Sequence, residues 1–180
     1  LHNNRHSFPT RRSSDLLRDA RFVLDVHLRK LAHRLRLLGF DAVFDERLDD
    51  PALADISSRE NRILLTRDRG LLKRRIVTRG LIVRSTDPAL QAREVLDRLD
   101  LRARCRPFTR CIECNGLIGP LPADTENFAA AKDTIPEGVL AWCCEYFQCS
   151  ACGKIYWKGS HFEKLERIVS AILGPGAARD

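Results

Sequence analysis

The chain has 180 residues, 44% of them hydrophobic, which suits one ordinary α/β domain plus a small appendage and excludes a large multidomain machine. Its net charge of +7 is uneven: residues 16–104 carry 20 basic against 14 acidic side chains, and residues 105–180 carry 8 against 9. Residues 16–104 are therefore expected to bind an anionic partner. No apolar run suits a membrane span or a signal peptide, so we expect a cytoplasmic protein without membrane contact.

The first 16 residues show neither the helical nor the strand period of apolar positions. Residues 1–16 are interpreted as a non-native or disordered N-terminal segment, and the chain has no Met, even at position 1. This segment is excluded from the predicted fold and is expected to carry no chemistry.

Short apolar runs and helical patterns then alternate four times. The predicted strands are 22–24, 42–44, 63–66 and 81–83, and the predicted helices follow them at 28–38, from 50, at 71–76 and at 88–99. Gly39 is expected to end the first helix, and Asp50 with Pro51 to provide the N-cap and first position of the second. Since all-apolar strands joined by helices indicate a parallel sheet covered on both faces, residues 17–104 are predicted to form a doubly wound α/β domain.

The composition changes after Cys105, where Cys, Gly and Pro become frequent and the alternation stops. We therefore predict a domain boundary between Arg104 and Cys105. Residues 105–180 are expected to form a smaller module that ends in an amphipathic helix, terminated at Gly174.

Acidic residues stand close to the ends of the predicted strands. Asp25 and Asp68 follow the first and third strands, Asp50 opens the helix after the second, and Asp87 follows the fourth. The carboxyl ends of parallel strands line one edge of a sheet, so these four acids are expected to converge there and to hold Mg²⁺ or Mn²⁺. Each acid taken alone could instead be a turn or capping residue. The alternatives to Asp50 at the middle position are Asp45, Glu46 and Asp49.

Four of the seven cysteines form two Cys-x-x-Cys pairs. They are Cys111 with Cys114 and Cys149 with Cys152. Two such pairs in one small module predict a structural zinc site with four thiolate ligands, and two redox dithiols are the weaker alternative. Cys105, Cys143 and Cys144 lack this spacing and are expected to be buried or free thiols, although exchange of Cys143 or Cys144 into the site stays open.

Two groups of basic residues are candidates for contact with RNA. One is a run beside Asp68 with Arg67, Arg69, Lys73 and Arg74, and the other is Lys158 with His161, just past the second cysteine pair. Lysine and arginine bind phosphate, and the neighbouring Tyr156 and Trp157 could stack on unpaired bases. The alternatives are a solvated helix face for the first group and packing of the two aromatic residues within the zinc module.

Four motifs follow one another along the chain: DVHLRKLAHRLRLLGFD from Asp25, ILLTRDRG from Ile63, PFTRCIECNG from Pro107 and CSACGKIYWKGSHF from Cys149. In this order they resemble the Mut7-C RNase domain family, a PIN-like nuclease domain followed by a zinc ribbon. The resemblance implies a PIN-like fold and a ribonuclease in which Asp25, Asp50 and Asp68 hold Mg²⁺ or Mn²⁺. Asp87 matches the fourth acid of such nucleases only loosely. A metal-activated water would then hydrolyse the RNA and leave a 5′-phosphate.

The main alternative is a catalytically inactive adaptor that binds RNA through the zinc ribbon. A scaffold that holds a protein partner is a third hypothesis. Cleavage of labelled RNA in Mg²⁺ or Mn²⁺ distinguishes the enzyme from both. Formation of a homo-oligomer is left open, because a parallel sheet has edges that can pair.

Overall fold

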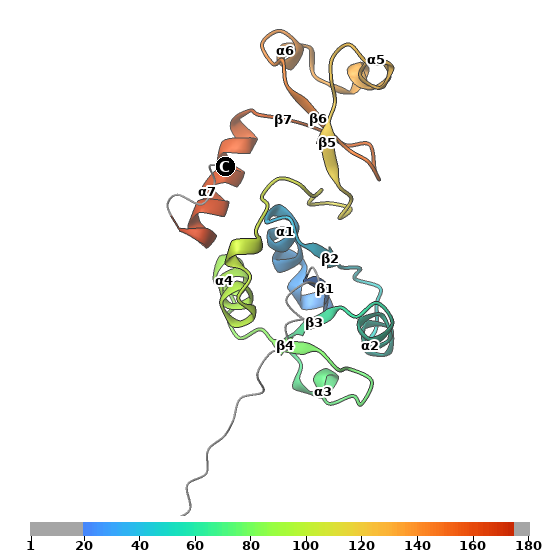
Figure 1. Cartoon of the computed structure of the whole chain (residues 1–180), viewed down its shortest axis with the longest axis vertical. Coiled ribbons are helices and arrows are strands. Elements are labelled where there is room, and N and C mark those ends of the chain that lie inside the picture. Colours follow the sequence, from blue (N-terminus) through green and yellow to red (C-terminus); the bar gives the residue numbers. More distant parts are fainter. Residues whose placement is uncertain (1–19, 175–180) are drawn as a thin grey trace, which may run out of the picture.

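The computed structural model describes residues 20–174, so the segment 1–16 lies outside the described residues. A four-stranded sheet forms the centre of the first half of the chain (Figure 1). Its strands are β1 (Arg21–Leu24), β2 (Asp41–Val43), β3 (Ile63–Thr66) and β4 (Gly80–Ile82), in the order β2-β1-β3-β4. All three pairings are parallel, which confirms the predicted α/β sheet.

Helices pack against both faces of this sheet. The apolar residues of α1 (Arg29–Leu37) and α4 (Pro88–Leu99) share a core with Phe22, Leu24 and Leu65. The opposite face buries Val23 and Leu64 against α2 (Asp50–Arg59) and α3 (Arg69–Leu72). Successive residues of a strand point to opposite faces, so a run of apolar residues such as 63–65 of β3 packs into both cores.

The strand order reverses between β1 and β3. After β1 the chain enters the 3₁₀ helix η2 (Val26–Leu28) and α1 on one face, whereas after β3 it enters α3 on the other. In open α/β sheets, ligands bind at the carboxyl ends of two such adjacent strands, and we call this end of β1 and β3 the crevice. Asp25 and Asp68 therefore stand at the point of the sheet where ligands typically bind.

Local signals account for most element ends, with two corrections. Gly39 follows α1 with φ of +91°, a left-handed conformation that glycine adopts without strain, as predicted. The N-cap of α2 is Asp49, whose side chain accepts a hydrogen bond from the N–H of Ala52, and Asp50 is the first helical residue. The sequence assigned this cap one residue too late, because either of two consecutive aspartates satisfies the pattern. The helix expected at 71–76 is α3, which begins earlier, directly after its cap Asp68, and is shorter.

The second sheet is antiparallel, with the order β5-β6-β7. Its strands are β5 (Ile118–Pro120), β6 (Tyr146–Cys149) and β7 (Ile155–Trp157). Between β5 and β6 the chain forms α5 (Glu126–Ala131), the 3₁₀ helix η4 (Lys132–Thr134) and α6 (Glu137–Leu140), which the sequence did not predict. A small core joins this insertion to the sheet through Phe128, Ile135 and Tyr146.

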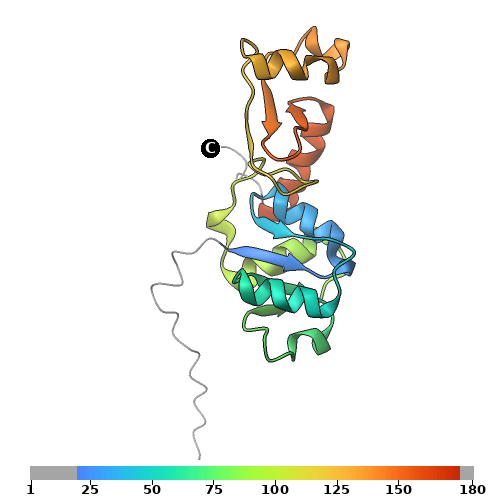
Figure 2. The same ribbon diagram turned by 90° about the vertical axis from the view of Figure 1, so that its right-hand side faces the viewer.

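The last helix, α7 (Ser160–Leu173), follows the second sheet and packs beside α4 (Figures 1 and 2). Its Val169 and Ile172 are fully buried in the core that α1 and α4 also line. Arg93 and Arg102 donate hydrogen bonds to the Ile172 carbonyl at its end. The 3₁₀ helix η3 (Arg102–Arg104) stands at the predicted domain boundary. No helix within residues 20–174 has both the length and the apolar composition that crossing a bilayer requires.

Candidate active site and metal centre

The carboxylate of Asp25 is the most buried acid of the crevice, with only 6% of the residue exposed. Asp25 follows β1 directly and extends the strand pairing, since its N–H donates to the Leu65 carbonyl at 3.1 Å. Its Oδ2 accepts a 2.8 Å hydrogen bond from the hydroxyl of Thr66, and its Oδ1 accepts from the N–H of His27 at 3.4 Å. Within residues 20–174 this carboxylate forms no ion pair.

Thr66 connects Asp25 to Asp68. Its side chain is fully buried at the end of β3, and its Oγ1 also accepts a hydrogen bond of 2.9 Å from the N–H of Asp68. One hydroxyl therefore joins the carboxylate that ends β1 to the backbone that follows β3. Asp68 caps α3, because its Oδ1 accepts a 2.6 Å hydrogen bond from Gly70, while the residue itself is exposed.

The other two acids have separate partners. Asp50 is exposed at the start of α2, and its Oδ2 lies 3.9 Å from Nη2 of Arg74, which follows α3. Asp87 caps α4 by accepting hydrogen bonds from Ala89 and Leu90. Neither shares a described hydrogen-bond partner with Asp25 or Asp68. Hydrogen bonds through Thr66 thus connect Asp25 to Asp68. Within residues 20–174, Asp50 and Asp87 are not part of this hydrogen-bond connection.

The basic candidates beside the crevice are exposed. Arg67, Arg69 and Lys73 flank Asp68 on the surface, and Arg74 pairs with Asp50. In the second module, Lys158 forms a 2.8 Å ion pair with Glu145, and His161 lies exposed in the first turn of α7. The two aromatic residues just before Lys158 have structural contacts: Trp157 packs against the small core of the insertion, and the hydroxyl of Tyr156 contacts Sγ of Cys111.

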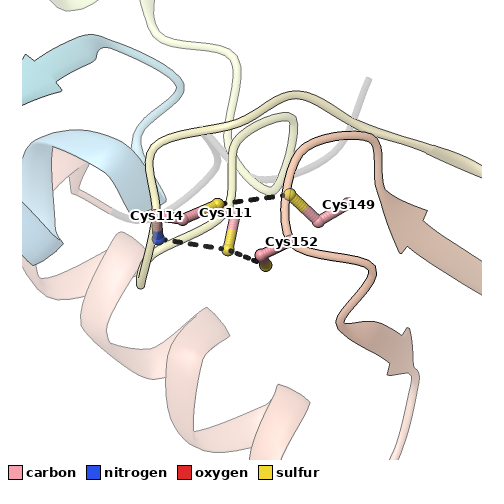
Figure 3. Close-up of side chains that lie close together, drawn as sticks. All are labelled: Cys111, Cys114, Cys149 and Cys152. Carbon is pink, nitrogen blue, oxygen red and sulfur yellow. Dashed lines mark hydrogen bonds between the residues drawn. The ribbon is translucent and has the colours of Figure 1, made fainter.

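The four cysteines of the two pairs meet at one end of the second sheet (Figure 3). Cys111 and Cys114 lie on the turn before β5, Cys149 ends β6, and Cys152 lies in the turn between β6 and β7. Across residues 20–174 this is the one group of three or more His, Cys, Asp or Glu whose ligand atoms all lie within 4.8 Å of one another.

The sulfur spacing suits a tetrahedral ion. Sγ of Cys111 lies 3.8 Å from that of Cys152, and Sγ of Cys114 lies 3.4 Å from that of Cys149. Zinc–sulfur bonds of about 2.3 Å in a tetrahedron require S···S edges of about 3.8 Å. The group could therefore hold zinc, and four thiolates leave no position open for a substrate. Cys105, Cys143 and Cys144 lie outside the group, and no disulfide occurs among the described cysteines.

Hydrogen bonds around Cys111 favour its thiolate. Burial opposes ionisation, but hydrogen bonds from the N–H of Cys114 and the hydroxyl of Tyr156, at 3.0 Å, lower the pKa of Cys111 to about 6. The turn is tight, because a Cβ on Gly116 would lie 2.8 Å from Sγ of Cys149. Glycine at this position thus lets the two turns approach each other.

Sequence reasoning missed the residues that attach the first cysteine turn to the α/β domain. The buried Arg36 of α1 donates hydrogen bonds to the carbonyls of Ile112 and Glu113, at 3.0 and 2.6 Å. Asn115 accepts from the N–H of Ala42 and donates to Asp41, both in the edge strand β2. The signal in the sequence was the Asn-Gly pair after Cys114, which predicts a turn but says nothing of what the turn contacts.

No curated protein and no solved structure shows significant similarity to the chain. The family model of the Mut7-C RNAse domain, in contrast, matches residues 20–169. The match covers both sheets, the acids at the carboxyl ends of the parallel strands and the four clustered cysteines. The chain therefore belongs to the Mut7-C RNAse domain family, as its four motifs indicated.

Proposed function

We propose that the protein is a divalent-metal-dependent ribonuclease with a PIN-like catalytic domain and a zinc ribbon. One observation carries this proposal: the Thr66 hydroxyl links Asp25 to Asp68 at the crevice between β1 and β3. Membership of an RNAse domain family supports RNA as the substrate. The excess of basic residues in 16–104 supports an anionic partner.

Asp25 and Asp68 are suited to hold Mg²⁺ or Mn²⁺. A buried carboxylate without an ion pair, such as Asp25, is costly unless a cation compensates its charge. Mg²⁺ commonly binds through one or two carboxylates and keeps several waters, so the site does not need a third acid within direct reach. When bound, such an ion lowers the pKa of a coordinated water and stabilises negative charge on phosphate oxygens.

Neighbouring residues orient the two carboxylates, and others would bind the RNA. Thr66 orients the carboxylate of Asp25, and the N–H of Gly70 orients that of Asp68. Asp50 and Asp87 would act from the rim through water, and Asp50 keeps Arg74 close to α2. Arg67, Arg69 and Lys73 would bind the phosphates on either side of the cleaved bond.

The proposed reaction is hydrolysis of a phosphodiester bond. The oxygen of a water molecule bonds to phosphorus as the water loses a proton to solvent, and the P–O3′ bond breaks. The 3′ oxygen takes up a proton, so the products carry a 5′-phosphate and a 3′-hydroxyl.

The zinc ribbon would have a structural role in this enzyme. Arg36 and Asn115 fix its first cysteine turn to α1 and β2. Zinc would therefore hold the ribbon in place beside the catalytic domain, and Lys158 and His161 would contact RNA outside the catalytic crevice.

Cleavage of a 5′-labelled single-stranded RNA by the purified zinc-loaded chain tests the proposal. We expect cleavage in Mg²⁺ or Mn²⁺ and loss of at least about 100-fold in rate with Asp25→Asn or Asp68→Asn, because metal ligands are essential to such chemistry. Asp124→Asn, which changes an exposed acid in the insertion, should leave the rate unchanged. Cleavage that persists in both site variants would contradict the proposal.

The second candidate is an RNA-binding adaptor without turnover. It is favoured by one observation: within residues 20–174 no three acids bring their oxygens within 4.8 Å of one another. Tight binding of the same RNA without cleavage in either metal would support the adaptor.

A further inference from the structure

A groove of about 820 Å³ lies outside the catalytic crevice and the cysteine cluster, where the insertion meets the start of α7. Its aromatic lining comes from three separate segments: Phe108 before the first cysteine turn, Trp142 after α6, and Phe162 in α7. Its charged lining consists of Lys158, Glu163 and Glu166. None of the three aromatic residues has a role in the proposed chemistry.

Trp142 presents an exposed indole beside Gly159. A Cβ on Gly159 would lie 3.7 Å from Cη2 of Trp142, so the indole lies next to this glycine. The exposed fraction of Trp142 is 57%, and it is one of five large hydrophobic residues that are exposed within residues 20–174. An exposed indole is a typical stacking platform for an unpaired base.

The groove also has an aromatic wall and a cationic side chain. The rings of Phe108 and Phe162 pack with centroids 4.6 Å apart, which joins the segment before the first cysteine turn to α7. Lys158 pairs with Glu145, but both side chains are more than half exposed, at 57% and 62%. Ion pairs of this kind contribute little, so the ammonium group can exchange its carboxylate for a phosphate.

The carboxylates of Glu163 and Glu166 favour binding of a base over binding of a phosphate. Glu163 and Glu166 would repel a phosphate, but they can accept hydrogen bonds from the amino and imino groups on the edge of a base. The lining therefore complements a nucleotide whose base is inside and whose phosphate is at Lys158.

We propose that this groove binds one unpaired base of the RNA, stacked on Trp142, with its donor edge toward Glu163 or Glu166 and its phosphate at Lys158. The inference rests on the proposed function for its ligand, since it assumes that RNA is the substrate. The amino group of cytidine presents one N–H on its C5 side, away from the acceptors of the base, whereas the single donor of uridine, N3–H, lies between two carbonyl oxygens that a carboxylate repels. Cytidine should therefore bind better than uridine.

The test uses the full chain with Trp157→Phe, which leaves Trp142 as its single tryptophan. Titration with an oligocytidine octamer, without added divalent cation, should quench the fluorescence to saturation, and oligouridine should bind more weakly. Trp142→Ala in the wild-type chain should weaken binding of labelled oligocytidine about 5- to 150-fold, the loss expected for one stacked base. Trp142→Phe should retain most of the affinity. Leu90→Ala, an exposed apolar residue of α4 outside the groove, is the matched control.

The outcomes separate this inference from the nuclease proposal. Quenching by RNA in a protein that never cleaves RNA would support the groove and contradict the enzyme. Cleavage by a protein whose Trp142 is not quenched, and whose RNA affinity Trp142→Ala leaves unchanged, would overturn the groove alone. A dimer that Trp142→Ala dissociates, with RNA affinity unchanged, would also overturn it, because the groove would then bind a second copy.

Discussion

At the scale of single residues, Thr66 links the two acids that the proposed chemistry requires. A hydroxyl both donates and accepts, so this residue can donate to the carboxylate of Asp25 and accept from the N–H of Asp68. The sequence showed Thr66 only as part of a Thr-x-Asp motif at the end of a strand. Its bonding across two strands depends on the order β2-β1-β3-β4, which no local pattern determines.

Replacing Thr66 by Val removes the hydroxyl and keeps the shape and the strand preference. We expect a loss of about 1–3 kcal/mol in the free energy of unfolding, because Asp25 loses a buried hydrogen bond. We also expect RNA cleavage or Mn²⁺ affinity to fall about 10- to 100-fold, as for other groups that orient a metal ligand. Urea unfolding and the cleavage assay measure the two effects. Thr66→Ser keeps the hydroxyl and should recover most of the activity; equal activity in the Val and wild-type proteins would contradict the role of Thr66.

At the scale of elements, the apolar pattern predicted the parallel sheet well and the second module poorly. Strand β3 and helix α4 have the predicted bounds, because their apolar runs and the Asp87-Pro88 start are unambiguous. The helices α5 and α6 were missed, since they are short and bury few residues, such as Phe128, against the ribbon sheet. Docking of α7 on α4 could not be predicted either, because an amphipathic helix shows that it has a partner but not which one.

In the candidate site, too, the sequence predicted local groupings of residues better than contacts between distant segments. Spacing alone identified the four cysteines that meet, because two close pairs can reach one ion. The four acids follow four different strands, and Asp50 stands at the start of α2, so their convergence depends on the lengths and paths of the loops after those strands. Connection of Asp25 to Asp68 is observed, and the roles of Asp50 and Asp87 stay predictions.

Asp41 of β2 accepts hydrogen bonds from Arg62, just before β3, and from Asn115 of the first cysteine turn, so its ionisation should make the stability of the protein depend on pH. Burial raises its pKa, but hydrogen bonds from Arg62 and Asn115 outweigh this and lower the pKa to about 2. The stabilisation is therefore complete above the ordinary pKa near 3.8 and is lost as the pH falls from about 4 to about 2.

Asp41→Asn should accordingly be less stable than the wild type at pH 7, and the difference should shrink between pH 4 and pH 2. Urea unfolding at several pH values measures it, with Asp124→Asn, an exposed acid of the insertion, as the control. A difference that does not change with pH would show that Asp41 acts by packing alone.

At the scale of the whole molecule, the part of the chain with the four clustered cysteines is connected to the parallel sheet and its helices at two places. The first cysteine turn is bonded to α1 and β2, and α7 returns from the second sheet to the core beside α4. Along the chain the insertion lies between these two connections, and the groove of Trp142 is lined by residues that are remote in sequence from Asp25 and Asp68. Loss of the ion should therefore loosen the ribbon and its groove more than the parallel sheet.

We expect one zinc ion per purified chain by elemental analysis, because four thiolates complete a tetrahedral site. Cys149→Ser should lower the zinc content and the thermal stability. Cys144 is an exposed thiol outside this group, so Cys144→Ser should change neither the zinc content nor the thermal stability. Full zinc content in Cys149→Ser would mean that other residues hold the ion.

The central claim is that Asp25 and Asp68 hold a divalent cation in the crevice between β1 and β3. Crystals of the zinc-loaded protein soaked in Mn²⁺, with anomalous diffraction recorded at the manganese edge, test it most directly. We predict a manganese peak in contact with the carboxylates of Asp25 and Asp68 in the wild type, and its loss in Asp68→Asn. A saturating soak that leaves the crevice without a peak, or a peak bound only by other residues, would contradict the claim.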